Sequence, residues 1–282
     1  MRVTIRDLRR MKRDGEKIPM ITAYDYTSAQ LVERAGIPLI LVGDSLGQVV
    51  LGYDSTVPVT MDDMIHHIKT VVRGTERAHI VGDLPFLSYH TSVFDALRNA
   101  GRLLKEGGAQ SVKLEGGQNQ APAVNRIVAS GIPVMGHIGL TPQSVNQLGG
   151  YRVQGKSLKA AVQLMEDARA LEEAGAYAIV LECVPAPLAR MISERVAIPT
   201  IGIGAGVGCD GQVQVFHDLM GLYQDFTPKH ARKYANLGDA IVSATSDYVS
   251  DVQSDRFPTD KESYTLSRKV LDALSDHSAS PV

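Results

Sequence analysis

The sequence predicts one (β/α)8 TIM barrel, an α/β fold in which eight parallel strands alternate with helices around a closed sheet. Three observations favour this fold. Nearly unbroken apolar runs, such as 39–43 and 178–181, recur along the chain and are typical of strands buried on both faces. Helical patterns separate most pairs of runs, and several runs end in an acid. The length of 282 residues is that of one ordinary barrel.

Eight strands can be counted in order. We expect them at residues 19–24, 39–43, 78–82, 111–115, 134–136, 178–181, 199–204 and 212–215. In the fourth strand, the alternation of side chains places Lys113 and Glu115 on one face, directly before a glycine pair. Salt-bridged strand surfaces often carry such a pair, so these two residues alone do not define a site. A site is favoured because acids end other strands too.

Helix signals occupy the segments between the strands. The expected N-terminal caps are Thr27 with Gln30, Thr60 with Asp63, and Ser92 with Asp95. Apolar side chains at helical spacing across 158–171 predict an amphipathic helix that covers the sheet. The long connection at 46–59 has the character of a functional lid.

The two ends of the chain predict additions to the barrel. Val3, Ile5, Leu8 and Met11 predict a short amphipathic N-terminal helix that caps the barrel. Residues 227–252 predict a final helical layer, after which the sequence becomes more polar. We therefore expect a single barrel domain over residues 1–264, including the terminal helices, and a polar C-terminal tail over 265–282.

Composition excludes several classes of protein. With 44% hydrophobic and 21% charged residues, the chain resembles an average soluble protein. A formal net charge of −2 leaves no basic field for nucleic acid or anionic lipid. Two cysteines, Cys183 and Cys209, are too few for a disulfide framework, which favours the reducing cytoplasm. No apolar run approaches the length that spans a bilayer, and the basic N-terminus lacks the apolar core of a secretory signal.

Acids end the second, third and fourth strands at Asp44, Asp83 and Glu115. The carboxyl ends of barrel strands meet on the face that carries the active site, so we expect these acids to converge. They are hard oxygen ligands without histidine or cysteine at zinc spacing, a combination that suits Mg²⁺. Three buried carboxylates would otherwise repel one another, and Lys113 supplies only one positive charge. The alternative is that each acid separately caps the helix after its strand.

Glu182 ends the sixth strand and lies apart from the other acids in sequence. A carboxylate at the edge of an apolar pocket binds a proton more readily, which suits a general base that removes a proton beside a carbonyl. The alternative is a solvent-facing acid on the loop. His137, at the end of the fifth strand, could donate to a substrate oxygen or could equally be a packed histidine bonded to the backbone.

Two further motifs invite functions that their spacing does not support. Ser45 lies in Gly-Asp-Ser-Leu-Gly, which lacks the glycine spacing of a nucleophile elbow, so a binding role for its hydroxyl is favoured. The glycine-rich turn 202–206 departs from the dinucleotide-binding fingerprint. After the seventh strand of a barrel, such a turn lets a substrate approach the backbone closely.

Seven short motifs follow one another in order. They are VGDSLG at 42–47, GYDST at 52–56, DLPF at 83–86, VKLEGG at 112–117, GHIGLTPQ at 136–143, LE at 181–182 and IGIGAG at 201–206. Together they resemble the ketopantoate hydroxymethyltransferase family, over residues 4–264. The departures from the family pattern are Gln48, Gln214 and His230, and none of them touches the expected chemistry.

The resemblance implies a barrel of the phosphoenolpyruvate mutase-like group that forms a cytoplasmic homo-oligomer, commonly a decamer. It implies transfer of a one-carbon unit from 5,10-methylenetetrahydrofolate to the keto acid 3-methyl-2-oxobutanoate, which gives ketopantoate, the first step of pantothenate biosynthesis. One Mg²⁺ per subunit would be held by Asp44, Asp83 and Glu115. The keto acid would lie against Asp44, Ser45, Asp83 and Lys113, with Glu182 as the base.

Two other functions remain open at this point. One is a metal-dependent carbon–carbon lyase on the same barrel, although neither Cys183 nor Cys209 lies in the lid loop where such enzymes carry a reactive cysteine. The other is a keto-acid- or folate-binding barrel that has lost its chemistry. Such a protein would normally lack a metal ligand or the base, and all four acids are present.

Overall fold

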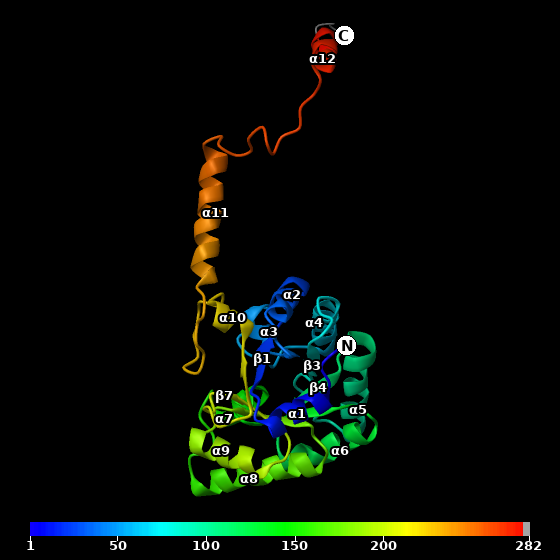
Figure 1. Cartoon of the computed structure of the whole chain (residues 1–282), viewed down its shortest axis with the longest axis vertical. Helices are drawn as coiled ribbons and strands as arrows, with labels where there is room; N and C mark the ends of the chain where they lie inside the picture. Colours follow the sequence, from blue (N-terminus) through cyan, green and yellow to red (C-terminus); the bar gives the residue numbers. More distant parts are fainter. Residues whose placement is uncertain (279–282) are drawn as a thin grey trace. The chain divides into compact units, whose positions relative to one another are not determined.

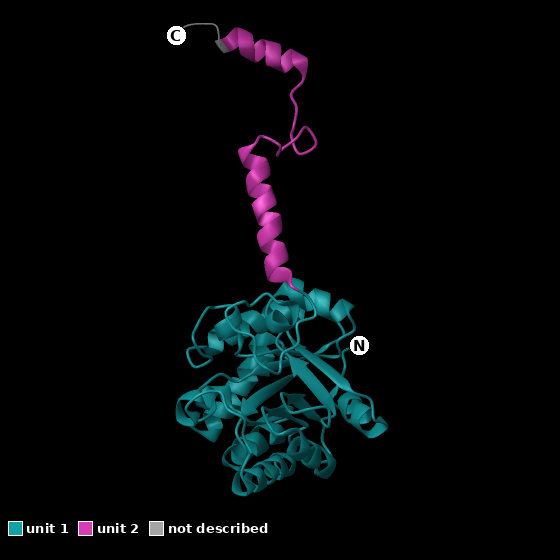
Figure 2. Ribbon diagram, turned by 90° about the vertical axis from the view of Figure 1, so that its left-hand side faces the viewer, with its two compact units in different colours: residues 1–235 teal, residues 236–282 magenta. Residues whose placement is uncertain are grey.

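The computed structural model describes residues 1–278 of the chain. Its internal contacts divide the chain into two units, Met1–Ala235 and Asn236–Val282, which Figure 2 colours teal and magenta. Unit 1 contains the barrel and unit 2 contains two helices, and each unit is described by itself. The predicted domain over 1–264 and tail over 265–282 stay a prediction.

Unit 1 is a closed barrel of eight parallel strands in the order β1 to β8 (Figure 1). The strands are β1 (Ile18–Thr22), β2 (Leu39–Val42), β3 (His79–Asp83), β4 (Ser111–Glu115), β5 (Val134–Gly139), β6 (Ala178–Glu182), β7 (Thr200–Ile203) and β8 (Gly211–Gln214). Each strand pairs with the next, and β8 closes the barrel on β1. The predicted fold class is confirmed, and every predicted strand overlaps an observed one.

Strand side chains alternate between the helical layer and the barrel interior. In β4, Val112 packs in the apolar cluster between sheet and helices, whereas Lys113 and Glu115 are buried on the opposite side. The register pairs Lys113 with Asp83 of β3 and Glu115 with His137 of β5. Strand pairing alone therefore brings these charged and polar side chains side by side.

Ten α-helices belong to unit 1, and most of them lie around the outside of the barrel. They are α1 (Ile5–Asp14), α2 (Tyr26–Arg34), α3 (Leu46–Val49), α4 (Met61–Arg73), α5 (Val93–Arg102), α6 (Ala121–Ala129), α7 (Val145–Leu148), α8 (Leu158–Glu173), α9 (Ala186–Arg195) and α10 (Phe216–Met220). Short turns of other helix types occur at η1 (Leu103–Gly107), η2 (Gln118–Gln120) and η3 (Pro142–Ser144). The expected amphipathic helix over 158–171 is confirmed by α8, whose Leu164, Ala168 and Leu171 are buried.

Two of the three predicted caps are confirmed. The Thr60 hydroxyl accepts a hydrogen bond from the Asp63 backbone N–H at 3.1 Å, and Ser92 caps α5 in the same way. The cap predicted at Thr27 is wrong, because α2 begins earlier at Tyr26. The carboxylate of Asp25 accepts from the Ser28 backbone N–H at 2.9 Å and thereby takes the capping position.

Helix α1 closes the amino end of the barrel, as predicted. Leu8 is buried and packs in the apolar cluster of the barrel interior, and Val3, Ile5 and Met11 pack against the same cluster. The guanidinium of Arg2 donates to backbone carbonyl groups between Val72 and Ala78, at the end of α4 and in the turn after it. The N-terminal segment is thus fixed to the barrel by apolar packing and by hydrogen bonds.

A buried polar chain crosses the barrel above this plug. The His79 Nδ1–H donates to the carbonyl oxygen of Val3 at 3.0 Å, and its Nε2 lies 2.9 Å from the Ser111 hydroxyl. That hydroxyl lies 3.0 Å from the hydroxyl of Tyr177. Because a carbonyl can only accept, the proton of the imidazole lies on Nδ1. Burial lowers the pKa of His79 to about 4, so the ring is neutral at pH 7.

Unit 2 consists of α11 (Leu237–Gln253) and α12 (Arg268–Ser278). The final helical layer predicted over 227–252 begins later than expected, at Leu237, since residues 227–236 form no regular helix and Pro228 lies among them. The predicted polar tail over 265–282 falls partly on residues 279–282, which lie outside the described residues.

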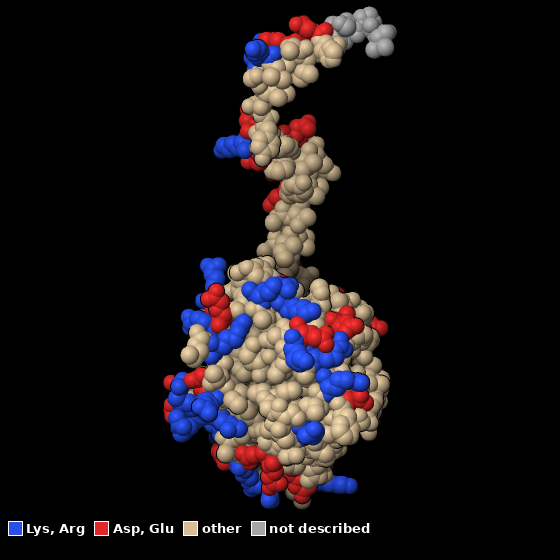
Figure 3. Space-filling model, turned by 90° about the vertical axis from the view of Figure 1, so that its right-hand side faces the viewer, with Lys and Arg blue, Asp and Glu red and all other residues tan. Residues whose placement is uncertain are grey.

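The helices and the surface charges can be compared with the prediction that the protein binds neither membranes nor nucleic acid. No helix within residues 1–278 is long and apolar enough to cross a membrane. On the face of unit 1 seen in Figure 3, basic and acidic side chains are intermingled, and neither sign covers the face. That face has no continuous basic field of the kind that nucleic acid requires.

Candidate active site

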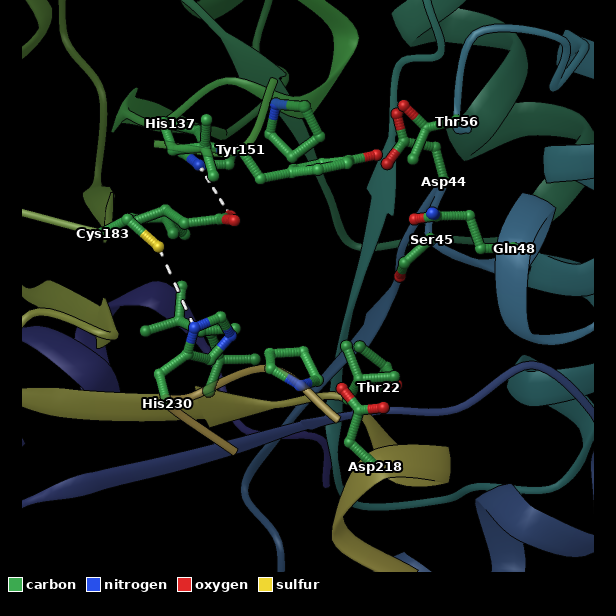
Figure 4. A pocket seen from close by; sticks show the side chains of 18 of the residues that line it. Thr22, Asp44, Ser45, Gln48, Thr56, His137, Tyr151, Cys183, Asp218 and His230 are labelled. Atoms are coloured by element: carbon green, nitrogen blue, oxygen red, sulfur yellow. Dashed lines mark hydrogen bonds and ion pairs between the residues drawn. The ribbon is translucent and has the colours of Figure 1, made fainter. Parts of the chain in front are cut away.

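One cavity of about 650 Å³ opens at the carboxyl end of the barrel. It is lined by every residue that the sequence predicts for the site, namely Asp44, Ser45, Asp83, Lys113, Glu115, His137 and Glu182. Figure 4 shows Asp44 and Ser45 on one side of this cavity and His137 on another. The structure therefore brings together side chains from five different strands or strand ends, and the reading of these acids as separate helix caps fails.

The pair of Lys113 and Asp83 forms the centre of the charged cluster. Lys113 Nζ lies 2.7 Å from Asp83 Oδ1, and both side chains are buried. Burial alone would lower the pKa of Lys113, but Asp83, Glu115 and Asp44 outweigh it and raise that pKa above its ordinary value. Lys113 is therefore a permanent ammonium ion that faces several acids.

The remaining acids are not neutralised by that single charge. Burial, followed by the charge of Asp83, raises the pKa of Asp44 to about 7. Burial also raises the pKa of Glu115 well above its ordinary value, despite the opposing effect of Lys113. The Asp44 backbone N–H donates to Asp83 Oδ2 at 3.1 Å, which fixes the spacing of these two acids. The cluster thus contains more carboxyl groups than its one cation can neutralise, so Asp44 and Glu115 each favour a proton or a cation.

Gln143 joins two of the acids and was not identified as a site residue from the sequence. Its side-chain N–H donates to Asp44 Oδ2 at 2.8 Å and to the carbonyl oxygen of Leu84 at 2.9 Å. Its backbone N–H donates to Glu115 Oε2 at 3.1 Å. The buried hydroxyl of Tyr89 donates to Gln143 Oε1 at 2.7 Å. The only sequence signal was the place of Gln143 at the end of the motif 136–143.

Glu182 and His137 form a second contact in the cavity. His137 Nε2 lies 3.3 Å from Glu182 Oε2, and His137 Nδ1 lies 3.2 Å from Lys113 Nζ. Burial and the charge of Lys113 lower the pKa of His137, so the ring is neutral. With Nδ1 accepting from the ammonium, the proton belongs on Nε2, which faces Glu182. Both nitrogens of His137 face protein groups, so its predicted contact with the substrate stays a prediction.

The backbone after β5 lies directly on the backbone of Glu182. The Leu140 backbone N–H donates to the carbonyl oxygen of Glu182 at 2.8 Å. Gly139 has a φ of +94°, and a Cβ atom placed there would approach that same carbonyl oxygen to 2.2 Å. Only glycine combines this backbone conformation with this contact. Glycine at position 139 therefore allows the backbone at the end of β5 to pack closely against the backbone of Glu182 at the end of β6.

Ser45 fits a binding role. Its hydroxyl lies 2.8 Å from the hydroxyl of the buried Tyr24, and it lines the cavity beside Asp44. This partner is a tyrosine, which does not activate a serine as a nucleophile in the way that a histidine does. The hydroxyl is instead held in a fixed position at the cavity wall.

The carboxylates of the cluster are candidate ligands for Mg²⁺. Among residues 1–278, no three His, Cys, Asp or Glu side chains are arranged as they stand into a metal site. Mg²⁺ is commonly bound by only one or two carboxylates and keeps several water ligands, so such an arrangement is not required. The hard oxygen donors of Asp44, Asp83 and Glu115 fit this ion, because a divalent cation would replace the protons that the raised pKa values of Asp44 and Glu115 favour. The donor chemistry therefore agrees with a hard divalent cation.

Solved structures with the same fold define the class of this protein. Phosphonopyruvate hydrolase superposes with a TM-score of 0.61 at 13% sequence identity, covering 99% of this chain and 96% of that one. A 2,3-dimethylmalate lyase, described as a member of the PEP mutase/isocitrate lyase superfamily, gives 0.58 at 17% identity, with 99% and 97% covered. The protein is a (β/α)8 barrel of this fold group with its cavity at the carboxyl end of the strands.

The sequence comparisons are more specific than the fold. The family model for ketopantoate hydroxymethyltransferase matches residues 2–260. The 3-methyl-2-oxobutanoate hydroxymethyltransferases of Dehalococcoides mccartyi and Chloroflexus aurantiacus are each 64% identical to this chain, covering 97% of it and 97% and 96% of their own lengths. The chain belongs to the ketopantoate hydroxymethyltransferase family. The predicted family and the predicted enzyme class, a one-carbon transferase, are confirmed.

Proposed function

We propose that this protein transfers a hydroxymethyl group from 5,10-methylenetetrahydrofolate to 3-methyl-2-oxobutanoate, with Asp44, Asp83 and Glu115 as Mg²⁺ ligands and Glu182 as the general base. The observation that carries the proposal is the convergence of the acids, Lys113 and Glu182 on one cavity. When bound, Mg²⁺ would polarise the ketone and thereby acidify the neighbouring carbon. Membership of the family supports the reaction, and the cavity supports the roles of the residues.

The keto acid is held by the side of the cavity formed by β2, β3 and β4. Lys113 supplies a fixed positive charge next to Asp83, at 2.7 Å, and can offset the negative charge that develops on the enolate oxygen. The Ser45 hydroxyl, fixed by Tyr24, is a ready donor to the substrate carboxylate. These groups orient the branched carbon, and burial of the cluster keeps water away from it.

Glu182 removes the proton from the branched carbon. Its carboxylate lies 3.3 Å from His137 Nε2, and that contact holds one carboxylate oxygen while the other is left for the substrate. His137 acts here as a positioning residue, because it contacts Glu182 and Lys113. A neutral imidazole can orient the base without taking up its proton.

The carbon–carbon bond then forms between the enolate carbon and the methylene carbon of the folate. The two carbon–nitrogen bonds of the methylene bridge are replaced by this bond and by a bond to the oxygen of water. The proton taken by Glu182 and a proton of that water go to the two folate nitrogens. The products are ketopantoate and tetrahydrofolate, and the atoms balance.

Exchange of deuterium into the branched carbon of the keto acid, without folate, tests the base. Glu182→Gln keeps the shape of the side chain and removes its basicity, so we expect exchange to fall by about 10²- to 10⁴-fold while keto-acid binding is retained. Glu194→Gln, on the exposed part of α9, is the matched control. Wild-type exchange in Glu182→Gln would disprove the role, and wild-type exchange that EDTA leaves unchanged would disprove the Mg²⁺.

Location and assembly belong to the same proposal. We place the enzyme in the cytoplasm as a homo-oligomer, and the two free thiols, Cys183 and Cys209, support a reducing compartment. Size-exclusion chromatography with light scattering would measure the number of subunits. A monomer at micromolar concentration would contradict the proposed assembly.

A further inference from the structure

One carboxylate in the cavity has no part in the chemistry described above. Five carboxylates line the cavity, and four of them are Asp44, Asp83, Glu115 and Glu182. The fifth is Asp218, in α10, which follows β8 and thus lies on the other side of the barrel mouth from β2 to β5. Figure 4 shows its carboxylate directed into the same cavity, near Thr22.

Asp218 is largely buried, and its carboxylate has no hydrogen-bond or ion-pair partner within the part of the chain that the structure describes. The residue is only 6% exposed. Among residues 1–278, its side-chain oxygens take part in no hydrogen bond or ion pair, and the cation that acts on it from a distance is the exposed Lys233. Burial accordingly raises the pKa of Asp218 to about 6. A carboxylate that is largely buried, faces a cavity and receives no donor from these residues is available to a ligand that supplies the donors.

The position of Asp218 is fixed from β1. The hydroxyl of the buried Thr22 accepts a hydrogen bond from the Phe216 backbone N–H at 2.9 Å, at the first residue of α10. One turn later, the helix ends at Gly221, whose backbone N–H donates to the carbonyl oxygen of Asp218 at 3.2 Å. The carboxylate is thus held by the backbone on both sides rather than by contacts of its own.

The walls beside Asp218 are apolar and partly aromatic. They are formed mainly by Val213, Val215, Tyr223, Phe226 and Pro228, and Lys229 and His230 of the same segment also line the cavity. A volume of about 650 Å³ is within the range of pockets that bind drug-sized ligands and exceeds the need of a five-carbon keto acid. The cavity therefore has a second part, flanked by flat hydrophobic groups and carrying one buried acid.

We propose that Asp218 binds the pterin ring of the one-carbon donor by accepting hydrogen bonds from its N3–H and its 2-amino group. These two N–H groups lie side by side on one edge of the ring, like the donor edge of a guanidinium, and match the two oxygens of a carboxylate. The aromatic and apolar walls would contact the faces of the ring. The inference rests on the proposed function, because it assigns the folate part of that site.

The test compares Asp218→Asn with the wild type. The amide places an N–H donor where the ring presents its own donors, so we expect the KM for methylenetetrahydrofolate to rise about 10- to 100-fold, the effect of a hydrogen bond to a charged group. Calorimetric affinity for tetrahydrofolate should fall by the same factor. Folate-independent deuterium exchange should stay at the wild-type rate. Asp225→Asn, an exposed acid in the following loop, is the matched control.

A ligand variant gives a second, independent measurement. A tetrahydrofolate analogue that carries hydrogen in place of the 2-amino group should bind the wild type about 10-fold more weakly than tetrahydrofolate does, whereas Asp218→Asn should discriminate much less between the two. This difference separates a direct contact from a general disturbance of the fold.

The outcomes distinguish this inference from the proposed function. Unchanged folate affinity in Asp218→Asn, or equal discrimination by both proteins, would overturn the contact to the pterin. Loss of exchange together with folate binding would also overturn it, because Asp218 would then support the whole site. Failure of the wild type to exchange deuterium would instead contradict the role of Glu182.

Discussion

The two ends of the barrel both bury polar side chains, and they do so in opposite ways. At the amino end, His79, Ser111 and Tyr177 form a chain whose hydrogen-bonding groups are paired within the protein and closed off by α1. At the carboxyl end, Asp44 and Glu115 are buried beside further acids with one ammonium group among them. The first network is complete, and the second requires a ligand or a proton.

Burial acts on both networks and shifts their titration in opposite directions. It lowers the pKa of His79 to about 4, so stability decreases as the pH falls from 6.5. It raises the pKa of Asp44 to about 7, so the native state holds a proton that the unfolded state has lost, and stability decreases as the pH rises towards 7. The hydrogen bonds at the amino end are satisfied within the protein and stabilise the fold. The acids at the carboxyl end are not neutralised within the protein and are therefore suited to binding a ligand.

The largest predicted effect removes the one cation of the carboxyl end. Lys113→Met leaves the acids without their counter-charge, and we expect the free energy of unfolding to fall by about 3–5 kcal/mol at a pH near 8. The loss should be smaller near pH 5, because Asp44 is then protonated. Urea denaturation at both pH values measures this. Lys113→Arg is the control that keeps the charge, and equal losses at both pH values would contradict the explanation.

The amino end should respond to acid through His79. The unfolded imidazole gains its proton below pH 6.5 and the native one only below about 4, so acidification over that window costs the wild type up to about 3 kcal/mol. His79→Gln can hydrogen-bond but does not titrate, and its stability should fall less over the same window. Denaturation curves between pH 7 and pH 4 measure the difference. Parallel curves for the two proteins would show that His79 is not responsible.

The smallest effects come from a matched pair of serines, each bonded to a tyrosine hydroxyl. Ser111→Ala deprives His79 and Tyr177 of their shared partner and should cost about 1–2 kcal/mol of stability with unchanged kinetics. Ser45→Ala should leave stability nearly unchanged and raise the KM for the keto acid several-fold. Thermal melting and steady-state kinetics on both variants test the comparison. A loss of stability in Ser45→Ala together with a raised KM in Ser111→Ala would refute it.

The sequence predicts the barrel and its charged cluster because both follow from strand patterns. Apolar runs locate the strands, and an acid directly after a run, such as Asp83, must lie at the carboxyl end. Gln143 and Asp218 come from the short turn η3 and the short helix α10, in which too few residues follow one another for a periodic pattern to indicate the direction of a side chain. The cap at Thr27 failed because Asp25 offered a competing carboxylate two residues earlier.

Gly139 has a consequence for anyone who wishes to alter the range of keto acids that the enzyme accepts. Since any side chain at that position would collide with the backbone of Glu182, library mutagenesis there should return inactive clones whatever residue is installed. Val180 lies in β6 and lines the same cavity, so replacing it with a smaller residue would enlarge the cavity. Directed evolution towards bulkier acceptors is best begun at Val180, with Gly139 kept constant.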